Sequence, residues 1–451
     1  MIEPSDKLTL GDALSAARDT RVLEIGSGVL NKTPEIFRRQ FGERMAVIVA
    51  DSNTFAVAGR KVVELFQGAN QACRQPFIYA DPGLYAEHTR VTELEASLKQ
   101  HDAIPIAVGS GTINDLTKLA AHRAGRSYIC VATAASMDGY TAYGASITYQ
   151  GSKQTFDCPA PAGVIADLDI ISAAPGDMNS WGYTDLIAKI TAGADWILAD
   201  ALGIEPIQPQ PWSIAQGRLR ELLSNPAGVR ARQSEAVRQL TEGLMLGGFA
   251  MQAARTSRAA SGAEHQFSHL WDMQYHTHNG KAPSHGFKVG IGTLAVTALY
   301  EYLLAQPLES LDVERCCAEW PNAAAREKMA RELFDDAELI EVAVRESQAK
   351  EIDAAALRDQ FEQLRRSWPT LRKRLRAQLM SFAELKKTLQ TVGAPVEPEQ
   401  IGIVRTRLKD SFRRAFFIRR RFTVLDLAFR IGMLDTALAE IFGKGGPLSG
   451  K

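Results

Sequence analysis

The first 170 residues alternate short apolar runs with segments of helical periodicity, and this pattern restricts the fold most. The predicted strands are residues 21–25, 45–50, 104–108 and 127–131, and the segments between them with helical spacing include 57–66 and 114–124. Strands that alternate with helices pair in parallel and build a doubly wound sheet. Ligands of such sheets bind at the carboxyl ends of the strands.

The texture of the chain changes after about residue 172. Long segments with apolar residues at helical spacing follow, at 240–254, 290–304, 323–344 and 371–389. A turn is expected at Gly393-Ala-Pro395, and residues 443–451 are expected to fray. We therefore predict an α/β, Rossmann-like doubly wound domain at 1–172 and an all-helical domain at 173–451; the motifs described below predict nucleotide binding for the first and metal and substrate binding for the second.

Composition excludes several classes of protein. The 451 residues are 45% hydrophobic and 23% charged with a formal net charge of zero, so no field draws the chain to nucleic acid or anionic membranes. The five cysteines are scattered without CxxC spacing, which favours a reducing compartment. Residues 1–10 lack the apolar core of a signal peptide, and no membrane span is expected. We expect a cytoplasmic protein that spans no membrane.

A glycine turn follows the predicted strand 104–108 and precedes a helix; its residues are Gly109, Ser110, Gly111 and Thr112. Glycines let the backbone approach a pyrophosphate, and a helix start offers free N–H groups with a positive dipole end. The turn is not the six-residue GxGxxG fingerprint, and a tight turn without a ligand is the alternative. Asp115 is expected in the first helical turn, where the dipole favours a carboxylate.

Asp51 ends a predicted strand at the point where a carboxylate accepts a hydrogen bond from a ribose 2′-hydroxyl. This would favour NAD over NADP, because a 2′-phosphate would be repelled. A turn-initiating role together with Asn53 is the alternative, and the nearby Arg60 and Lys61 keep NADP open.

The segment after the strand 127–131 is unusually polar. Thr133 and Ser136 carry hydroxyls suited to a ribose or to the nicotinamide amide, and Asp138 is suited to a substrate hydroxyl. A polar loop with a tight Asp-Gly turn is the alternative.

Two histidine motifs point to a metal. His265 ends the run SGAEH, and His285 precedes Gly286; neutral imidazole is a common ligand of divalent transition metals. Asp185 is the candidate acidic ligand, although an ion pair with Lys189, four residues on, also explains it. Three ligands would leave coordination positions open for a substrate. Spacing cannot exclude the other histidines of this region, which are His269, His276 and His278.

These motifs resemble those of the sn-glycerol-1-phosphate dehydrogenases of the bacterial arabinose-operon type. That family lies within the superfamily of iron-containing alcohol dehydrogenases, glycerol dehydrogenase and dehydroquinate synthase. The matching runs, in order along nearly the whole chain, are DSNTFAVAGRKV from Asp51, GSGTINDL from Gly109, TAASMDGYTAYGASI from Thr133, APAGVIADLDII from Ala160, GYTDLIAKITAGADW from Gly182, SRAASGAEHQFSH from Ser257, HGFKVGIGT from His285, GAPVEPEQIGI from Gly393 and RRRFTVLDLA from Arg419.

The resemblance implies a dehydroquinate synthase-like fold and a homodimer or larger oligomer. It also implies a metal held by Asp185, His265 and His285, and Asp138 on the substrate side. The implied nucleotide contacts are Asp51, Gly109, Ser110, Gly111, Thr112, Thr133 and Ser136. The chain departs from the pattern at Arg258-Ala-Ala-Ser261, where relatives often have Arg-Pro-Ala-Ser, and 307–390 matches weakly.

The expected reaction is reversible reduction of dihydroxyacetone phosphate, a small phosphorylated three-carbon ketone, to sn-glycerol 1-phosphate by NADH or NADPH. One divalent ion, zinc, nickel or iron, would act as a Lewis acid. Arg258, Ser261 and Lys288 are candidates for the substrate phosphate, although solvated surface charge also explains each cation. His269 is a candidate proton relay. Glu264 is expected to point away from His265 on the helix and to act on it at most indirectly.

Three other functions remain open from the sequence. The chain could oxidise another polyol or reduce another phosphorylated ketone with the same metal and nucleotide. A dehydroquinate synthase-like cyclase would need a more cationic site than the residues around His265 suggest. A nucleotide-binding regulator without catalysis would have no need of the three candidate ligands.

Overall fold

The computed structural model describes residues 7–81, 83–150 and 152–450. It divides into two compact units: a first unit of Met1–Tyr149, Lys153–Leu186 and Pro209–Ala260, and a second of Gln150–Ser152, Ile187–Gln208 and Ser261–Lys451. The segment Pro209–Ala260 packs within the first unit, whereas the boundary expected at residue 172 assigns it to the helical half. The functional division at that boundary stays a prediction.

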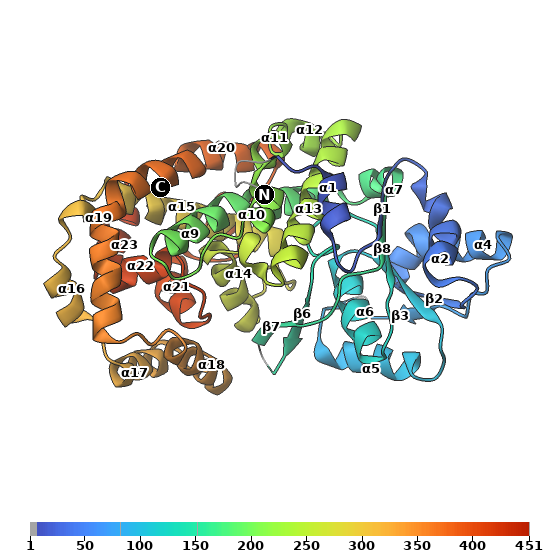
Figure 1. Cartoon of the computed structure of the whole chain (residues 1–451), viewed down its shortest axis with the longest axis horizontal. Coiled ribbons are helices and arrows are strands. Elements are labelled where there is room, and N and C mark those ends of the chain that lie inside the picture. The colour runs from blue at the N-terminus through green and yellow to red at the C-terminus, as the bar shows by residue number, and fades with distance from the viewer. Residues whose placement is uncertain (1–6, 82, 151, 451) are drawn as a thin grey trace. The chain divides into compact units, whose positions relative to one another are not determined.

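The first unit contains a six-stranded parallel sheet, as the alternating pattern predicts (Figure 1). In spatial order its strands are β1 (Val22–Gly26), β8 (Gly163–Asp167), β5 (Ile129–Ala132), β4 (Ile104–Gly109), β2 (Ala46–Asp51) and β3 (Phe77–Tyr79). The four predicted strands are present. The sequence pattern did not predict β3, β8 or the two-stranded sheet of β6 (Ala145–Tyr149) and β7 (Ser152–Phe156).

Helices cover both faces of this sheet. Side chains of α2 (Thr33–Phe41) and α4 (Arg60–Gly68) form one core cluster with alternate residues of the central strands, such as Ile48 and Ile106. The intervening strand residues point to the opposite face, where α6 (Gly111–Arg123) packs on the sheet and α5 (His88–Leu98) packs on α6. Burial of both faces explains why these strands are nearly uninterrupted apolar runs.

The remaining helices of the first unit connect and extend this layer. Their bounds are α1 (Leu10–Ala16), η1 (Val29–Lys32), α3 (Ser52–Thr54), η2 (Phe55–Gly59), α7 (Leu168–Ala173), α8 (Gly176–Ile187), α10 (Pro209–Gln216), α11 (Leu219–Leu222), α12 (Pro226–Arg230), α13 (Ser234–Ala254) and η3 (Ser257–Ala259). Only Ala188 separates α8 from the next helix, α9 (Lys189–Ala201), so the chain runs almost continuously from one unit into the other.

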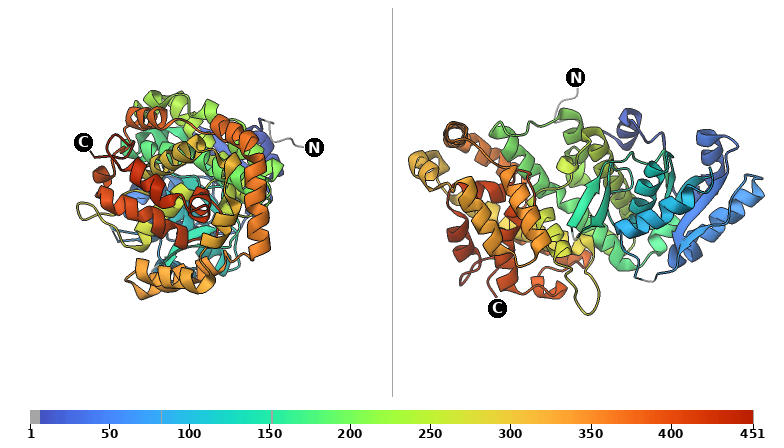
Figure 2. Two further views of the ribbon diagram at one scale, coloured as in Figure 1. Left: turned by 90° about the vertical axis from the view of Figure 1, so that its left-hand side faces the viewer. Right: turned by 90° about the horizontal axis from the view of Figure 1, so that it is seen from below.

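The second unit is built of helices packed on one another, drawn from yellow to red in Figures 1 and 2 apart from α9. After α9 these elements are α14 (Ala263–Met273), α15 (His285–Ala305), η4 (Leu308–Ser310), α16 (Val313–Glu319), α17 (Ala323–Leu333), α18 (Ala337–Gln348), α19 (Ala354–Gln378), α20 (Phe382–Val392), η5 (Pro398–Ile401), α21 (Arg405–Phe417), α22 (Val424–Arg430) and α23 (Leu434–Ile441). The expected helical character of this part of the chain is confirmed.

Helix α15 lies at the centre of this packing. It contacts α9, α14, α20, α22 and α23. By length and composition α15 could cross a membrane, with a mean hydropathy of 1.2, but 83% of its apolar window is buried inside the protein. Its composition is therefore explained by its place in the interior of the second unit.

Three expectations about the helical half were wrong. The segment 323–344 is two helices, because Asp336 accepts a hydrogen bond from the Leu339 amide and starts α18 anew. The segment 371–389 is likewise divided, since Ser381 caps α20. The tail does not fray over its described residues: Leu448 is buried, and its carbonyl accepts a hydrogen bond from Arg405.

Candidate metal centre and nucleotide site

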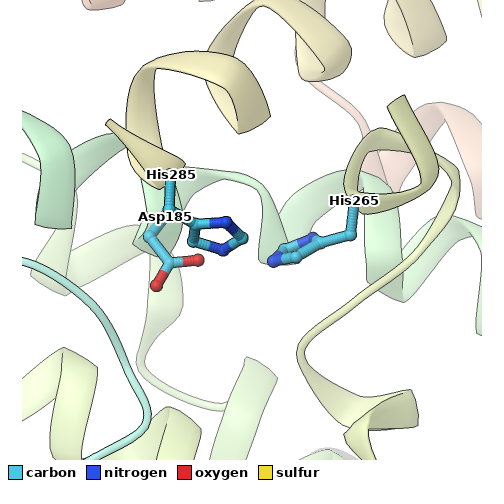
Figure 3. Close-up of side chains that lie close together, drawn as sticks. All are labelled: Asp185, His265 and His285. Carbon is cyan, nitrogen blue, oxygen red and sulfur yellow. The ribbon is translucent and has the colours of Figure 1, made fainter. Parts of the chain in front are cut away.

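Three side chains predicted as metal ligands lie together. Asp185 in the last turn of α8, His265 in the first turn of α14 and His285 at the start of α15 each offer one ligand atom, and these atoms all lie within 4.8 Å of one another (Figure 3). The three residues come from three helices and are 80 and 20 residues apart in sequence. Folding thus brings together a group that sequence spacing alone could only suggest.

The chemistry of this group fits one divalent transition metal. A carboxylate with two imidazoles suits zinc, iron or nickel. Bonds of about 2.0–2.2 Å to one tetrahedral ion place its ligand atoms about 3.4 Å apart, so seating an ion requires the three ligand atoms to move closer together by up to about 1.4 Å. Asp185 and His265 are buried and His285 is half-buried, which shields the group from bulk water. Three protein ligands leave coordination positions open.

Hydrogen bonds orient both imidazoles. Nδ1 of His265 lies 2.8 Å from Oε1 of Glu264, and Nδ1 of His285 lies 3.3 Å from Oγ of Ser268. With Nδ1 engaged in each ring, Nε2 is the nitrogen left for an ion. In Figure 3 the ring of His265 points toward the other two side chains.

The expected orientation of Glu264 was wrong. Glu264 is the second residue of α14, and its carboxylate turns back over the helix start, where it also accepts a hydrogen bond of 2.6 Å from the Gly262 amide. Side chains in a first turn reach back in this way because the helix start offers unsatisfied amides. Burial alone raises the pKa of Glu264, but the contacts with His265 and Gly262 outweigh it and hold that pKa below its usual value. Glu264 therefore places its carboxylate directly against the imidazole of His265.

The loop after β5 places Asp138 beside the ligand Asp185. The Asp138 amide donates a 3.0 Å hydrogen bond to Oδ2 of Asp185. The same loop is fixed by the buried ammonium group of Lys118, which donates to the carbonyls of Gly139, Ala142 and Gly144 at 2.9–3.0 Å. The polar residues after β5 thus lie in an anchored segment rather than a loose surface loop.

The other predicted substrate residues have distinct surroundings. The His269 ring centroid lies 6.3 Å from that of His265 and 6.4 Å from that of His285, one helical turn along α14. Ser261 is buried, and its carbonyl accepts a 2.6 Å hydrogen bond from Arg421. Arg258 is also buried, on η3. The substrate roles of Ser261 and Arg258 stay predictions.

Two further candidates are held by structural contacts instead. Lys288 is buried and forms an ion pair with Asp272, so it is not the solvated charge that the sequence suggested as the alternative. His276 Nε2 lies 2.7 Å from the carbonyl of Ile401, with its Nδ1 beside Arg407. Of the five histidines that spacing left open as metal ligands, His265 and His285 are the two that lie with Asp185 in the candidate ligand group.

The glycine turn lies where the sequence analysis expects it, between β4 and α6. A Cβ at Gly109 would lie 2.6 Å from Ile113, and one at Gly111 would lie 3.0 Å from Met137, so packing requires both glycines. Ser110 is the N-cap residue of α6 and its side chain makes no capping hydrogen bond within the described residues. The first amides of α6 thus lack a side-chain cap, as an anion site at a helix start requires. Thr112 is the second residue of the helix.

Asp115 is not in the first turn of α6, and that expectation was wrong. It is the fifth helical residue, and its carboxylate accepts a hydrogen bond from the Ser146 amide at 3.3 Å. Burial raises the pKa of Asp115, and the nearby Lys118 opposes that shift. Asp115 therefore helps to hold strand β6 in place through the Ser146 amide.

Asp51 forms the turn that the alternative interpretation describes, although with Thr54 and not with Asn53. Its Oδ1 accepts a hydrogen bond of 2.8 Å from the Thr54 amide, and Thr54 Oγ1 accepts one of 3.1 Å from the Asp51 amide. A cap uses one carboxylate oxygen, so this role does not exclude a ribose contact. Thr133 and Ser136 are both buried after β5, and Ala132 pairs with Gly109 across the sheet. The nucleotide roles of these residues stay predictions.

The free cysteines offer no nucleophile. Burial raises the pKa of Cys130 and Cys158 to about 12 and that of Cys73 to about 11. A thiolate is the reactive form of cysteine, so these thiols are inert at neutral pH.

Comparisons with known proteins agree with this architecture. Residues 24–175 match the family model described as iron-containing alcohol dehydrogenase. A glycerol-1-phosphate dehydrogenase [NAD(P)+] of Halalkalibacterium halodurans is 34% identical over 294 residues, which cover 65% of this chain and 73% of the relative. One of Geobacillus stearothermophilus is 28% identical over 404 residues, covering 89% of this chain and 90% of the relative.

Solved structures share the fold at low identity. A probable glycerol dehydrogenase from Sinorhizobium meliloti 1021 has a TM-score of 0.59 at 14% identity, covering 93% of this chain and 97% of that one. Glycerol dehydrogenase from Schizosaccharomyces pombe has a TM-score of 0.57 at 16% identity, covering 98% and 94%. These structures show the fold, and the sequence relatives establish that the chain belongs to the glycerol-1-phosphate dehydrogenase family of the iron-containing alcohol dehydrogenases.

Proposed function

We propose that this protein is a metal-dependent oxidoreductase that interconverts dihydroxyacetone phosphate and sn-glycerol 1-phosphate with NAD(H) or NADP(H). The observation that carries the proposal is the convergence of Asp185, His265 and His285 in a chain whose relatives are glycerol-1-phosphate dehydrogenases. A nucleotide-binding regulator without catalysis would have no reason to hold this ligand set.

Asp185, His265 and His285 would hold one divalent ion, which supplies Lewis-acid polarisation of the substrate carbonyl, while a bound nicotinamide supplies or accepts the hydride. The single carboxylate of this set leaves net positive charge on a bound divalent ion. The protein residues then have two tasks: they fix the two ligand rings, and they fix which carbonyl face meets the nicotinamide. Control of that face distinguishes sn-glycerol 1-phosphate from its enantiomer.

Ser261 and Arg258 are the proposed partners of the substrate phosphate. The Ser261 hydroxyl is buried and has no hydrogen-bond partner within the described part of the chain, so it is available to a ligand oxygen. Arg421 holds the Ser261 carbonyl and fixes the backbone at this position. A guanidinium such as that of Arg258 forms strong charge-assisted hydrogen bonds with phosphate oxygens.

Asp138 and His269 are the proposed polar partners of the reacting end of the substrate. The backbone of Asp138 contacts the ligand Asp185, which supports a side-chain contact with a substrate hydroxyl. His269 lies one turn from His265, close enough to pass a proton through one water molecule. Both assignments are tested by the kinetics of Asp138→Asn and His269→Asn.

The nucleotide is proposed to bind at the carboxyl edge of the sheet. The uncapped start of α6 at Gly109, Ser110, Gly111 and Thr112 would receive the pyrophosphate. Asp51 would accept from the ribose, and Thr133 and Ser136 would contact the nicotinamide half. Asp115 accepts a hydrogen bond from the Ser146 amide, and it would contribute to the nucleotide site indirectly by holding strand β6 in place. We further propose that the protein works in the cytoplasm. We also propose that it is a homodimer or larger homo-oligomer, and analytical sedimentation would measure that oligomeric state.

The direct test combines metal analysis with a chiral product assay. The purified protein, loaded with zinc, nickel or iron(II), is supplied with dihydroxyacetone phosphate and NADH or NADPH. The proposal predicts sn-glycerol 1-phosphate as the product and much weaker oxidation of unphosphorylated glycerol. Preferential use of glycerol, or turnover that a chelator leaves intact, would contradict it.

A further inference from the structure

Two buried polar residues of helix α9 reach the start of α14, the helix that carries His265. Thr191 and Asp195 lie one turn apart on α9, and both are buried. Thr191 Oγ1 lies 2.8 Å from Oε2 of Glu264 and 2.9 Å from the Ala188 carbonyl, so its single proton is shared between these two acceptors. Asp195 Oδ2 accepts a 2.7 Å hydrogen bond from the Ala263 amide. We call Thr191, Asp195 and Glu264 the α9–Glu264 network.

Asp195 links α9 to the second ligand helix as well. Its Oδ1 accepts a 2.6 Å hydrogen bond from the hydroxyl of Tyr300, which lies on α15, the helix that begins with His285. The same oxygen accepts a 2.8 Å hydrogen bond from the Val424 amide at the start of α22. One buried carboxylate thus contacts both helices that carry the histidine ligands.

The backbone at Gly262 is fitted to this network. A Cβ there would lie 2.5 Å from Oδ2 of Asp195 and 2.8 Å from Oε2 of Glu264. Only glycine therefore lets the chain pass this close to two carboxylates. The Gly262 amide uses the proximity, since it donates a 2.6 Å hydrogen bond to Oε1 of Glu264.

These contacts determine what Glu264 does to His265. Oε2 is bound by the Thr191 hydroxyl, and Oε1 faces both the Gly262 amide and the imidazole Nδ1 at 2.8 Å. A carboxylate held in this position favours the tautomer with a proton on Nδ1. The lone pair is then on Nε2, the nitrogen that a metal ion needs.

We propose that the α9–Glu264 network is a positioning device that fixes the ring orientation and tautomer of His265, so that the metal site is formed before the metal arrives. Glu264 is the positioning residue, and Thr191 and Asp195 hold it and the start of α14 in place. This inference rests on the proposed function, because it takes His265 as a metal ligand. It gives Thr191 and Asp195 a role that the histidine motifs do not assign.

The test is the affinity of the protein for Zn²⁺, measured by competition with a chromophoric chelator at one neutral pH. Glu264→Gln keeps the side-chain shape but presents an amide that both donates and accepts, so the tautomer is no longer fixed. We expect a loss of affinity of about 10- to 100-fold. Thr191→Val removes only the hydroxyl behind Glu264 and is expected to cost about fivefold.

The matched control is Glu346→Gln, which neutralises another buried carboxylate of the second unit. Within the described residues Glu346 contacts Arg345 and Arg420 but no histidine, so Zn²⁺ affinity is expected to stay within twofold of the wild type. NADH affinity and the melting temperature are measured for each variant. A variant that loses Zn²⁺ affinity while keeping both has lost positioning and not folding.

A spectroscopic measurement reports the tautomer directly. In metal-free protein labelled with ¹⁵N-histidine, His265 is expected to carry its proton on Nδ1 in the wild type and to show a mixture in Glu264→Gln. An unchanged tautomer together with unchanged Zn²⁺ affinity in Glu264→Gln would overturn the inference. If Glu264→Gln fails to fold, Thr191→Val decides the question with the same two measurements.

Different results would contradict the proposed function and the positioning role of Glu264. If wild-type protein binds no divalent metal, the proposed function is wrong. If wild-type protein binds Zn²⁺ and reduces dihydroxyacetone phosphate, but Glu264→Gln and Thr191→Val bind Zn²⁺ as the wild type does, only the positioning role is wrong.

Discussion

The Asp195 carboxylate accepts hydrogen bonds at 2.6 Å from the Tyr300 hydroxyl and at 2.7 Å from the Ala263 amide. Tyr300 belongs to the helix that begins with His285, and Ala263 begins the helix that carries His265. Protein contacts that need no ion therefore link the two helices that carry the candidate histidine ligands. A site formed in this way binds a metal without first ordering its ligands, which lowers the entropic cost of binding.

Tyr300→Phe tests this link with little change in shape. The variant removes one donor to Asp195 and leaves the two amide donors in place. Loss of one such hydrogen bond is expected to lower the free energy of unfolding by about 1–2 kcal/mol. Chemical denaturation measures the change. A variant as stable as the wild type would mean that the hydroxyl contributes nothing to holding α15.

Asp51→Asn tests the proposed ribose contact separately from the turn. Asparagine still accepts the Thr54 amide, so the cap is kept while the charge is lost. We expect weaker binding of NADH, and tighter binding of NADPH because repulsion of its 2′-phosphate is removed. Fluorescence titration with both nucleotides measures the ratio.

Asp51→Gly is the companion variant. Glycine at an N-cap costs only a few tenths of a kcal/mol relative to aspartate, so the fold should survive. NAD affinity is expected to fall more than NADP affinity. If both affinities are unchanged in both variants, Asp51 is a turn residue and nothing more.

Gly182→Ala tests a close backbone approach next to the ligand Asp185. A methyl group at Gly182 would lie 2.0 Å from the carbonyl oxygen of Ala135, which is backbone and cannot turn aside. The variant is expected to lose more than about 2 kcal/mol of stability or to fail to fold. Gly68→Ala is the control, because nothing lies within 4 Å of the added carbon at the end of α4, and it should gain about 0.4–1 kcal/mol. Similar melting temperatures for the two variants would contradict the close approach.

The pair of Glu346 and Arg420 predicts a pH dependence of stability. Burial raises the pKa of Glu346, but the Arg420 guanidinium at 2.8 and 2.9 Å outweighs it and holds that pKa below its usual value. A carboxyl group with a lowered pKa binds fewer protons in the folded state than in the unfolded one. Its stabilisation is therefore complete above the unfolded pKa, near 4.3, and is lost as the pH falls through the lowered folded value.

Glu346→Gln should accordingly be less stable than the wild type at pH 7 and should approach it in acid. Denaturant midpoints at pH 7 and at about pH 3 measure the two differences. Equal differences at both pH values would show that the ionised carboxylate is not what Arg420 binds.

The sequence predicted the fold more completely than the boundaries of its elements. Long apolar strands such as β2 and β4 are recognisable because both faces of the sheet are covered. β3 has only three residues, and β8 begins at a glycine just after two prolines, so neither produces a clear periodic signal. Breaks inside the helical half depend on single capping residues such as Asp336, which a periodicity window averages away.

The sequence predicted which three side chains lie together at the candidate site, but not the residues that hold them. The motifs around His265 and His285 are local and specific, so they could be recognised in the sequence. Glu264 was misjudged because helical geometry was applied as if the residue were inside the helix, whereas first-turn side chains reach back to the free amides. Thr191 and Asp195 lie some 70 residues before the helix that they hold, and no local pattern reports such a contact. Their only signal is that they lie four residues apart, on one face of a mostly apolar helix.

The assignment of the metal ligands is tested most directly by the metal content of the purified protein and of its His265→Ala variant, together with NADH titration of both. We expect about one equivalent of a divalent transition metal in the wild type. In the variant we expect no bound metal and no turnover, with NADH affinity unchanged. A variant that keeps its metal and its full activity would contradict the assignment of Asp185, His265 and His285 as the metal ligands.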